Sequence, residues 1–122
     1  MMSGHEQRLA ADTASVRVAR RVVTDLLTDI DEDVLEQLVL CTSEVVTNAI
    51  EHGAPPIDLR VDRANSHVRI QVSDASPLRP RPVDPSPTAI RGRGLLIVDR
   101  CASRWGVDED GSGKTVWFEF AI

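Results

Sequence analysis

Three polar side chains stand four residues apart in the segment "SEVVTNAIEHG", residues 43–53. Glu44, Asn48 and His52 supply a carboxylate, a carboxamide and an imidazole, and this spacing puts them in one row on a helix. A carboxylate can take a proton from an attacking hydroxyl or water, and an amide oxygen is a hard ligand suited to Mg²⁺. The solvated face of an amphipathic helix explains the same row without any ligand.

Capping signals in the sequence predict both ends of the helix that carries this row. Asp33 is predicted to cap its start while Glu36 reaches back, and Gly53 followed by "APP" is predicted to end it. Its opposite face carries an apolar stripe: Leu35, Leu38, Val39, Thr42, Val46 and Ala49. An earlier helix is predicted near residues 14–30 from a similar stripe: Val16, Ala19, Val23, Leu26, Leu27 and Ile30.

Strands are predicted where apolar and polar residues alternate. "IDLRVD" and "HVRIQVSD" alternate in this way, and "RANS" between them suits a hairpin. "RGRGLLIVDRCA" predicts a glycine turn into a short helix, and two strands are predicted around "EDGSG" near the end. The order of elements predicts a two-layer α/β sandwich with a mixed, mainly antiparallel sheet covered on one face by helices.

The length of the chain predicts a single domain. At 122 residues and 13.4 kDa it can bury a core that needs no disulfide or structural metal. We expect residues 1–12 to be disordered and residues 13–122 to form the domain. Five of the seven prolines fall between Pro77 and Thr88, which favours an extended, irregular loop that is either a lid or a long connection.

Charge and cysteine content narrow the classes of partner. A formal charge of -5 gives no broad electrostatic reason to bind nucleic acid or an anionic membrane. Cys41 and Cys101 are too few for a disulfide framework and lack metal-site spacing, so they predict reduced thiols and a cytoplasmic location. No aliphatic run is long enough to span a bilayer. A folded-protein partner or a small ligand fits this composition better.

The segment "GSGKT" at 111–115 looks like the end of a phosphate-binding P-loop. That motif requires a glycine where Asp108 stands and a helix after the Lys-Thr pair, whereas a strand is predicted here. We therefore do not interpret it as a P-loop.

Four segments together resemble the boxes of the GHKL (histidine-kinase-like) ATPase superfamily. "SEVVTNAIEHG" resembles its N box, "SDASP" its first glycine box in altered form, "GRGLLIVDR" the second, and "GKTVWFE" the last. The resemblance covers nearly the whole chain, and within the superfamily it is to the small bacterial anti-sigma factor serine kinases. It implies a Bergerat-type ATP-binding fold.

This resemblance implies roles for individual residues. Asn48 matches the protein ligand of Mg²⁺, and Glu44 matches the catalytic base. Asp74 resembles the aspartate that accepts a hydrogen bond from the adenine amino group, a readout that separates ATP from GTP because guanine presents a carbonyl there. Thr115 matches the threonine that supports the adenine site. A strand-end turn and strand propensity explain the last two residues without a ligand.

The phosphates are expected near the second glycine box. Gly92 and Gly94 permit close backbone approach, and the helix starting near Leu95 presents free amide donors. Two roles are open for the His52 side chain: contact with the ligand, or interaction with the last carbonyl groups of the helix. The residues expected to bind the nucleotide are Asn48, His52, Asp74, Ser76, Arg91, Gly92, Arg93, Gly94, Leu95 and Thr115. A solvated basic loop is the favoured explanation of the two arginines, with charge-assisted contacts to the phosphates as the alternative, and the same holds for Lys114.

The first glycine box departs from the family pattern. Most members continue the aspartate as D-x-G-x-G, whereas this chain has Ser76 and Leu78 in the two glycine places. Serine keeps the site small and polar but loses the freedom of glycine at positive φ. This change bears on nucleotide affinity and on the geometry of the proline-rich loop.

The resemblance implies a cytoplasmic, bacterial anti-sigma factor that uses ATP and Mg²⁺ and commonly acts as a homodimer. Such a protein sequesters a sigma factor and phosphorylates a serine or threonine of an anti-anti-sigma protein. The negative charge of the phosphate weakens binding by that anti-anti-sigma protein. From its 122 residues we expect neither the dimerisation helices of a sensor kinase nor the transducer domain of gyrase-like proteins. Two alternatives are a non-catalytic module that sequesters a partner and binds ATP structurally or not at all, and an ATP hydrolase.

Overall fold

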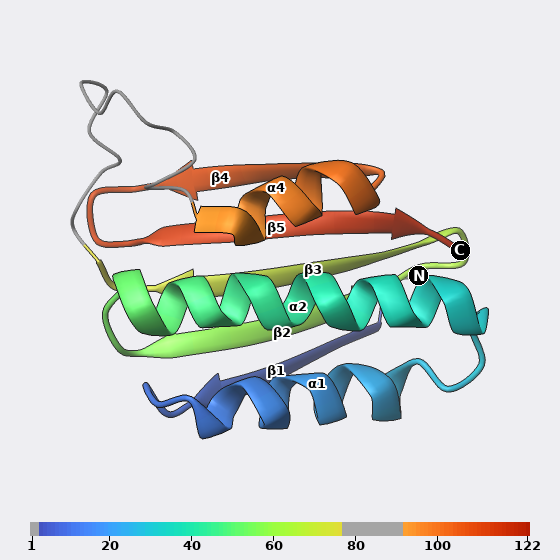
Figure 1. Cartoon of the computed structure of the whole chain (residues 1–122), viewed down its shortest axis with the longest axis horizontal. Helices are drawn as coiled ribbons and strands as arrows, with labels where there is room; N and C mark the ends of the chain where they lie inside the picture. The colour runs from blue at the N-terminus through green and yellow to red at the C-terminus, as the bar shows by residue number, and fades with distance from the viewer. Residues whose placement is uncertain (1–2, 77–91) are drawn as a thin grey trace.

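Residues 3–76 and 92–122, which the computed structural model describes, form a five-stranded sheet with helices on one face (Figure 1). The elements in chain order are β1 (Ser3–Leu9), α1 (Ala14–Leu26), α2 (Glu32–His52), β2 (Ile57–Arg63), β3 (His67–Asp74), α4 (Gly92–Cys101), β4 (Arg104–Glu109) and β5 (Lys114–Ala121). The strand order is β1-β2-β3-β5-β4, and each neighbouring pair described is antiparallel. The predicted two-layer α/β sandwich with a mainly antiparallel sheet is confirmed.

The core lies between the sheet and the helix layer. Alternate side chains of the central strands point toward the helices, and Phe118 is fully buried among them. The buried apolar residues of β2, β3 and β5 are Ile57, Leu59, Val61, Val68, Ile70, Val72, Val116, Phe118 and Phe120. The alternation of these strands in the sequence was therefore a reliable guide to their buried face.

The N-terminal cap of α2 is Asp31, so the prediction of Asp33 was wrong. The backbone of Asp31 is extended, and its carboxylate accepts hydrogen bonds from the N–H groups of Asp33 at 3.1 Å and Val34 at 3.2 Å. Two orphan donors of the first turn are satisfied in this way. At the other end Gly53 closes the helix as predicted, with its N–H donating to the Ala49 carbonyl at 2.9 Å.

The buried face of α2 accommodates a threonine. Thr42 is fully buried, as its place in the apolar stripe predicted, and its hydroxyl donates to the Leu38 carbonyl at 2.8 Å. Cys41 and Val45 join the same face, and burial raises the pKa of the Cys41 thiol to about 12. Both cysteines of the chain are free thiols.

Helix α1 is shorter than predicted. It ends at Leu26, and the backbone of Leu27 leaves the helical region with φ -125 and ψ 39. The Leu27 side chain still reaches the core, whereas the Leu26 side chain lies 40% exposed. Within the described residues, no helix is long and apolar enough to cross a membrane.

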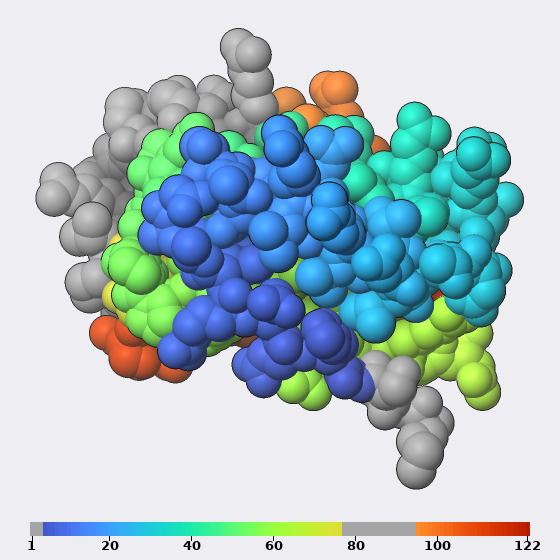
Figure 2. All heavy atoms as spheres, turned by 90° about the horizontal axis from the view of Figure 1, so that it is seen from below, coloured from blue at the N-terminus to red at the C-terminus, as the bar shows by residue number. Residues whose placement is uncertain are grey.

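Strand β1 was not predicted, because residues 1–12 were expected to be disordered. It pairs with β2 from Ser3 opposite Arg63 to Leu9 opposite Ile57, and Leu9 is buried at 4% exposure. Figure 2, which views this edge of the molecule, shows the atoms of β1 and α1 side by side. Apart from Leu9 this strand is polar on both faces and so lacks an amphipathic pattern. The backbone of β1 forms hydrogen bonds with N–H and C=O groups of β2, which would otherwise be the unpaired edge of the sheet.

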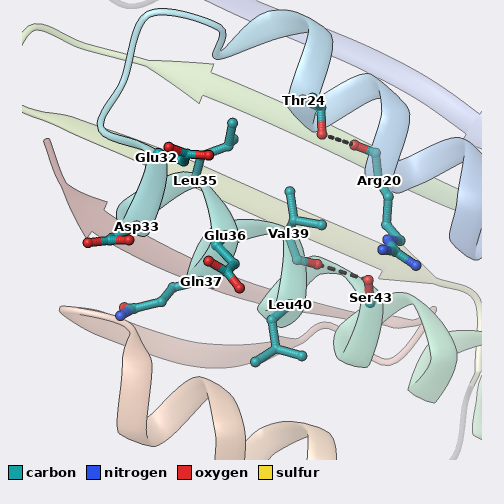
Figure 3. Close-up of a pocket in the computed structure, with 10 residues that line it drawn as sticks. All are labelled: Arg20, Thr24, Glu32, Asp33, Leu35, Glu36, Gln37, Val39, Leu40 and Ser43. Carbon is teal, nitrogen blue, oxygen red and sulfur yellow. Dashed lines mark hydrogen bonds between the residues drawn. The ribbon is translucent and has the colours of Figure 1, made fainter.

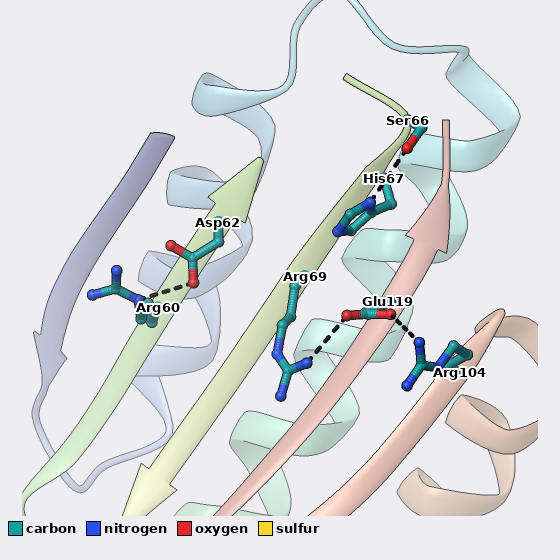
Figure 4. A network of polar contacts seen from close by, with 7 residues as sticks. All are labelled: Arg60, Asp62, Ser66, His67, Arg69, Arg104 and Glu119. Atoms are coloured by element: carbon teal, nitrogen blue, oxygen red, sulfur yellow. Dashed lines mark hydrogen bonds and ion pairs between the residues drawn. The ribbon is translucent and has the colours of Figure 1, made fainter. Parts of the chain in front are cut away.

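The face of the sheet away from the helices is polar (Figure 4). Glu119 accepts a hydrogen bond from Arg69 at 3.1 Å and pairs with Arg104 at 3.7 Å. The Arg69 guanidinium lies 4.2 Å from the centre of a Trp117 ring, and the guanidinium of Arg104 lies 5.8 Å from it. Gly106 lies so close to this ring that a Cβ there would be 2.8 Å from it. These contacts cover the tryptophan without a third layer.

The Leu9→Ala variant tests the N-terminal strand. Removal of a buried leucine side chain is expected to lower the free energy of unfolding by about 2–3 kcal/mol, because a cavity replaces packed methyl groups. Urea denaturation followed by circular dichroism measures it. The matched control Leu26→Ala, at an exposed site, is expected to change stability by less than about 0.5 kcal/mol. Equal effects of the two changes would mean that β1 does not pack on the core.

Candidate functional site

Four segments far apart in the sequence meet at one end of the molecule. Figure 1 shows the last turn of α2, the end of β3, the start of β5 and the first turn of α4 at this end. A backbone hydrogen bond joins two of them directly, from the N–H of Ala75 to the carbonyl of Ala54 at 2.8 Å. The segments predicted as separate boxes are therefore neighbours in space.

The Asp74 carboxylate lies at the centre of this junction. Its side chain is only 2% exposed. Oδ1 accepts hydrogen bonds from the backbone N–H of Ser76 at 2.8 Å and of Ala54 at 3.4 Å. Oδ2 lies 3.0 Å from Nζ of Lys114. The carboxylate thus links the segment after α2, the end of β3 and the start of β5.

Two glycines leave room for this arrangement. A Cβ on Gly53 would lie 2.5 Å from the Asp74 carboxylate carbon and 2.5 Å from the Ala49 carbonyl oxygen. A Cβ on Gly113 would lie 2.2 Å from the Asp74 carbonyl oxygen. The glycines are therefore needed for close approach of the chain.

Strand alternation separates Lys114 from Thr115. Lys114 is opposite Asp74 in the β3–β5 register, and its side chain lies on the same face as that carboxylate. Thr115 is opposite Ser73, and their hydroxyl groups lie 2.9 Å apart on the other face. Thr115 and Asp74 both border one hollow, and the support of the adenine site by Thr115 stays a prediction. Lys114, for which a phosphate contact and a solvated basic residue were the alternatives, forms an ion pair with Asp74.

The predicted polar row on α2 is present but is not uniformly exposed. Glu44 and Asn48 are half-buried, and both lie on the helix that ends beside Asp74. His52 is the last residue of α2, and its side chain is 58% exposed. Within the described residues, its ring contacts the Glu51 carboxylate at 3.7 Å and not a helix carbonyl. The row therefore joins an exposed imidazole to two partly shielded polar groups.

Helix α4 begins with the second glycine box. Gly92 and Gly94 lie in its first turn, where backbone N–H groups have no partner within the helix. Leu95 is half-buried and packs against the core, so its side chain serves packing. Arg91 lies outside the described residues, as does the side chain of Arg93. The free amides of this turn are the group that can face an anion.

Hollows occur near both ends of α2 in the described part of the chain. One of about 310 Å³ borders Asp74, Gly113 and Lys114 and is otherwise lined mainly by acidic and small residues. A larger one of about 890 Å³ lies at the far end of α2 and against α1 (Figure 3). None of the predicted nucleotide-binding residues lines this larger hollow. The site predicted from the sequence thus does not coincide with it.

The arrangement combines the buried carboxylate of Asp74, the half-buried side chains of Glu44 and Asn48, and the first turn of α4. A family model described as "Histidine kinase-like ATPase domain" matches residues 9–120 of this chain. The chain belongs to the histidine kinase-like ATPase family. The resemblance seen in the four boxes is thereby confirmed, and with it a kinase-like, ATP-binding type of domain.

Individual relatives of this histidine kinase-like domain agree with that assignment. "Uncharacterized protein SCO4941" of Streptomyces coelicolor is 34% identical over 80 residues, which cover 61% of this chain and 75% of that protein. The solved RsbU and RsbW domains of Rv1364c from Mycobacterium tuberculosis superpose with a TM-score of 0.76 at 21% identity, over 97% of this chain and 32% of that one.

A second solved structure has the same fold. The histidine kinase domain of the blue-light activated histidine kinase EL346 from Erythrobacter litoralis superposes with a TM-score of 0.63 at 18% identity. The match covers 88% of this chain and 59% of that one. This chain thus spans less than two thirds of either solved structure, and at such identities the likeness shows the fold.

The Gly113→Ala variant tests the close approach at Asp74. An added Cβ would collide with the Asp74 backbone, so the free energy of unfolding is expected to fall by about 1–3 kcal/mol. Thermal and urea unfolding measure this loss. In the same hairpin, Gly111→Asn is the control, because no atom lies within 4 Å of an added Cβ and asparagine tolerates its φ of 83°. Equal stability of the Gly113→Ala and Gly111→Asn variants would contradict the predicted collision.

Proposed function

We propose that this domain is an anti-sigma factor that binds Mg-ATP, sequesters a sigma factor and phosphorylates a serine or threonine of an anti-anti-sigma protein. The observation that carries this proposal is the junction at Asp74. Its contacts with Ala54 and Lys114 bring the N box, the first glycine box and the last box to one end of the fold. Membership of the histidine kinase-like ATPase family supports ATP as the nucleotide.

The residues present fit a magnesium nucleotide. Asn48 offers a neutral amide oxygen on a half-buried helix face, which suits a cation that keeps several waters and takes few protein ligands. Within the described residues, no cluster of three or more His, Cys, Asp or Glu side chains can hold a metal. The proposed metal site therefore depends on Asn48 together with phosphate oxygens and water.

The protein groups then have distinct tasks. Mg-ATP, when bound, supplies the γ-phosphoryl group and neutralises part of its charge. Glu44 is one helical turn before Asn48, and we assign it to accept the proton of the attacking hydroxyl. The amides of the first turn of α4 hold phosphate oxygens, with Arg91 and Arg93 adding charge. Asp74 accepts a hydrogen bond from the amino group of adenine, and Ser76 of the altered glycine box lies beside it. His52, at the exposed end of the row, is assigned a contact with the ligand.

The partners are proposed from the branch of the family. The fold of this chain matches a Mycobacterium tuberculosis structure that contains an RsbW domain and an RsbU domain in one chain. This likeness supports a role in partner-protein signalling. A sigma factor and an anti-anti-sigma substrate are the proposed partners, a homodimer is the proposed assembly, and the bacterial cytoplasm is the proposed location.

A second candidate function is a non-catalytic module that sequesters its partner without transferring phosphate. One observation favours it: the Asp74 carboxylate is 2% exposed and already has protein partners in two N–H groups and Lys114. The presence of Ser76 where most family members have glycine also favours the non-catalytic module. The two functions differ in a single measurable outcome, which is the appearance of phosphate on the partner protein.

The Asn48→Ala variant tests the metal assignment. Magnesium-dependent ATP affinity is expected to fall by more than the roughly 10–100-fold that loss of an outer-shell metal partner costs. Calorimetric titration with ATP, with and without Mg²⁺, measures this affinity. Gln37→Ala is the matched control, since it removes a carboxamide from the exposed start of the same helix and should leave binding unchanged. An Asn48→Ala protein that binds Mg-ATP like the parent would refute the assignment.

The Glu44→Gln variant tests the catalytic base. It keeps the shape of the side chain, so ATP affinity should be retained, whereas phosphoryl transfer is expected to slow by about 10²–10⁴-fold. Transfer of labelled phosphate to the anti-anti-sigma protein measures the rate. Glu36→Gln, on the exposed part of α2, is the matched control. Undiminished transfer by Glu44→Gln would remove Glu44 from the mechanism, and no transfer by the parent protein would favour the non-catalytic module.

A further inference from the structure

The larger hollow, between α1 and α2, lies apart from the residues of the candidate site (Figure 3). It has a volume of about 890 Å³ and borders Arg20 and Thr24 of α1 and eight residues of α2 between Glu32 and Ser43. In Figure 3 the Arg20 side chain extends toward α2, while Val39 extends toward α1. A concave surface between two helices is the kind of surface that receives a further helix.

The α2 side of this hollow carries an apolar row. Leu35 and Val39 lie one helical turn apart, are half-buried and pack against the core, so part of each side chain stays open to the hollow. Leu40 adjoins them and is 44% exposed. An amphipathic helix that binds in a groove uses apolar anchors at this spacing. The hollow therefore fits the apolar face of such a helix.

Acidic side chains border the apolar row. Glu32, Asp33 and Glu36 line the hollow and are exposed. Within residues 3–76 and 92–122 none of these three carboxylates forms an ion pair, whereas Asp62 and Glu119, which point away from the helices, are paired with arginines.

The position of Glu36 shows that the acidic row does more than start the helix. Carboxylates in a first turn stabilise a helix through its dipole, which accounts for Glu32 and Asp33. Glu36 lies beyond that turn, where this effect is lost. With one guanidinium among three carboxylates in the lining, the potential of the hollow is negative. Positive charge beside an apolar face is therefore complementary to it.

The same charge disfavours other classes of ligand. Nucleic acids and anionic lipids present phosphate groups, which the three carboxylates repel. The phosphoryl acceptor is expected elsewhere, because the phosphates are proposed at the first turn of α4, which lies on the other side of α2 from α1 (Figure 1). A change at Glu36 is thus expected to affect this hollow and not phosphoryl transfer.

We infer that the hollow between α1 and α2 is a docking site for a basic amphipathic helix of a partner protein other than the phosphoryl acceptor. The apolar face of that helix packs on Leu35, Val39 and Leu40. Its Lys or Arg side chains pair with Glu36 and with the carboxylates of the first turn of α2. Docking in this hollow goes beyond the proposed function, since it requires neither bound nucleotide nor phosphoryl transfer.

A model peptide tests the chemistry of this docking site. The probe is a fluorescein-labelled peptide of about 15 residues, with leucine at helical i, i+3, i+4 and i+7 spacing and lysine elsewhere. A peptide with glutamate in place of every lysine is the control. Fluorescence anisotropy with the full chain is expected to show the lysine peptide binding at least about tenfold more tightly, and less tightly as salt is raised. Equal binding of both peptides would overturn the inference.

Two matched pairs of variants locate the peptide on the protein. Glu36→Lys should weaken binding of the lysine peptide by about 3–10-fold, whereas Glu109→Lys makes the same charge change at an exposed position outside the hollow and should cost less than about twofold. Leu40→Ala should weaken binding by about tenfold, whereas Leu26→Ala, 40% exposed and outside the hollow, should not. Equal effects within each pair would mean general attraction to an acidic protein, and the docking site would be refuted.

Further outcomes distinguish this docking site from a second copy of the chain and from the proposed function. If sedimentation analysis showed a dimer in the parent that Leu40→Ala alone abolished, the hollow would belong to a second copy and the inference would fail. A parent protein that binds Mg-ATP but not the lysine peptide would overturn the docking site and leave the proposed function standing. Binding of the peptide without binding of Mg-ATP would support the docking site and contradict the proposed function.

Discussion

The buried carboxylate of Asp74 needs partners, because an anion held away from water without them costs several kcal/mol. The fold supplies the partners from three segments: the N–H groups of Ala54 and Ser76 and the ammonium of Lys114. Satisfying this one group draws the end of α2, the end of β3 and the start of β5 together. The close approach in turn requires glycine at positions 53 and 113. The geometry of the candidate site is thus a consequence of how a single charge is accommodated.

A sheet with one covered face adds a second constraint. Because side chains alternate along a strand, neighbouring residues of β3 and β5 belong to different sides of the molecule. Asp74 and Lys114 face the helix layer, while the hydroxyls of Ser73 and Thr115 meet on the uncovered side. Residues that are adjacent in the sequence therefore present their side chains on opposite faces of the sheet at this point. Motif matching alone does not detect this difference, whereas strand register does.

The face of the sheet away from the helices has no third layer over it, and its polar side chains form ion pairs with one another. Arg60 donates to Asp62 at 2.9 Å (Figure 4), and Arg8 donates to Asp58 at 2.9 Å. Such exposed pairs contribute little to stability individually. Their effect is to keep the face polar while guanidinium groups shield the Trp117 ring.

The sequence by itself determined the helices, four of the five strands and the family, because helical and strand periodicities and the order of the four boxes are local signals. It placed Glu44, Asn48 and His52 in one row and ended α2 at Gly53. Only the tertiary structure decided that residues 3–9 form a strand, since that polar strand is stabilised by the open edge of β2. It also decided that Lys114 pairs with the Asp74 carboxylate. The physical reason is that a carboxylate's partner is set by strand register and burial, which bring together residues forty positions apart in the chain.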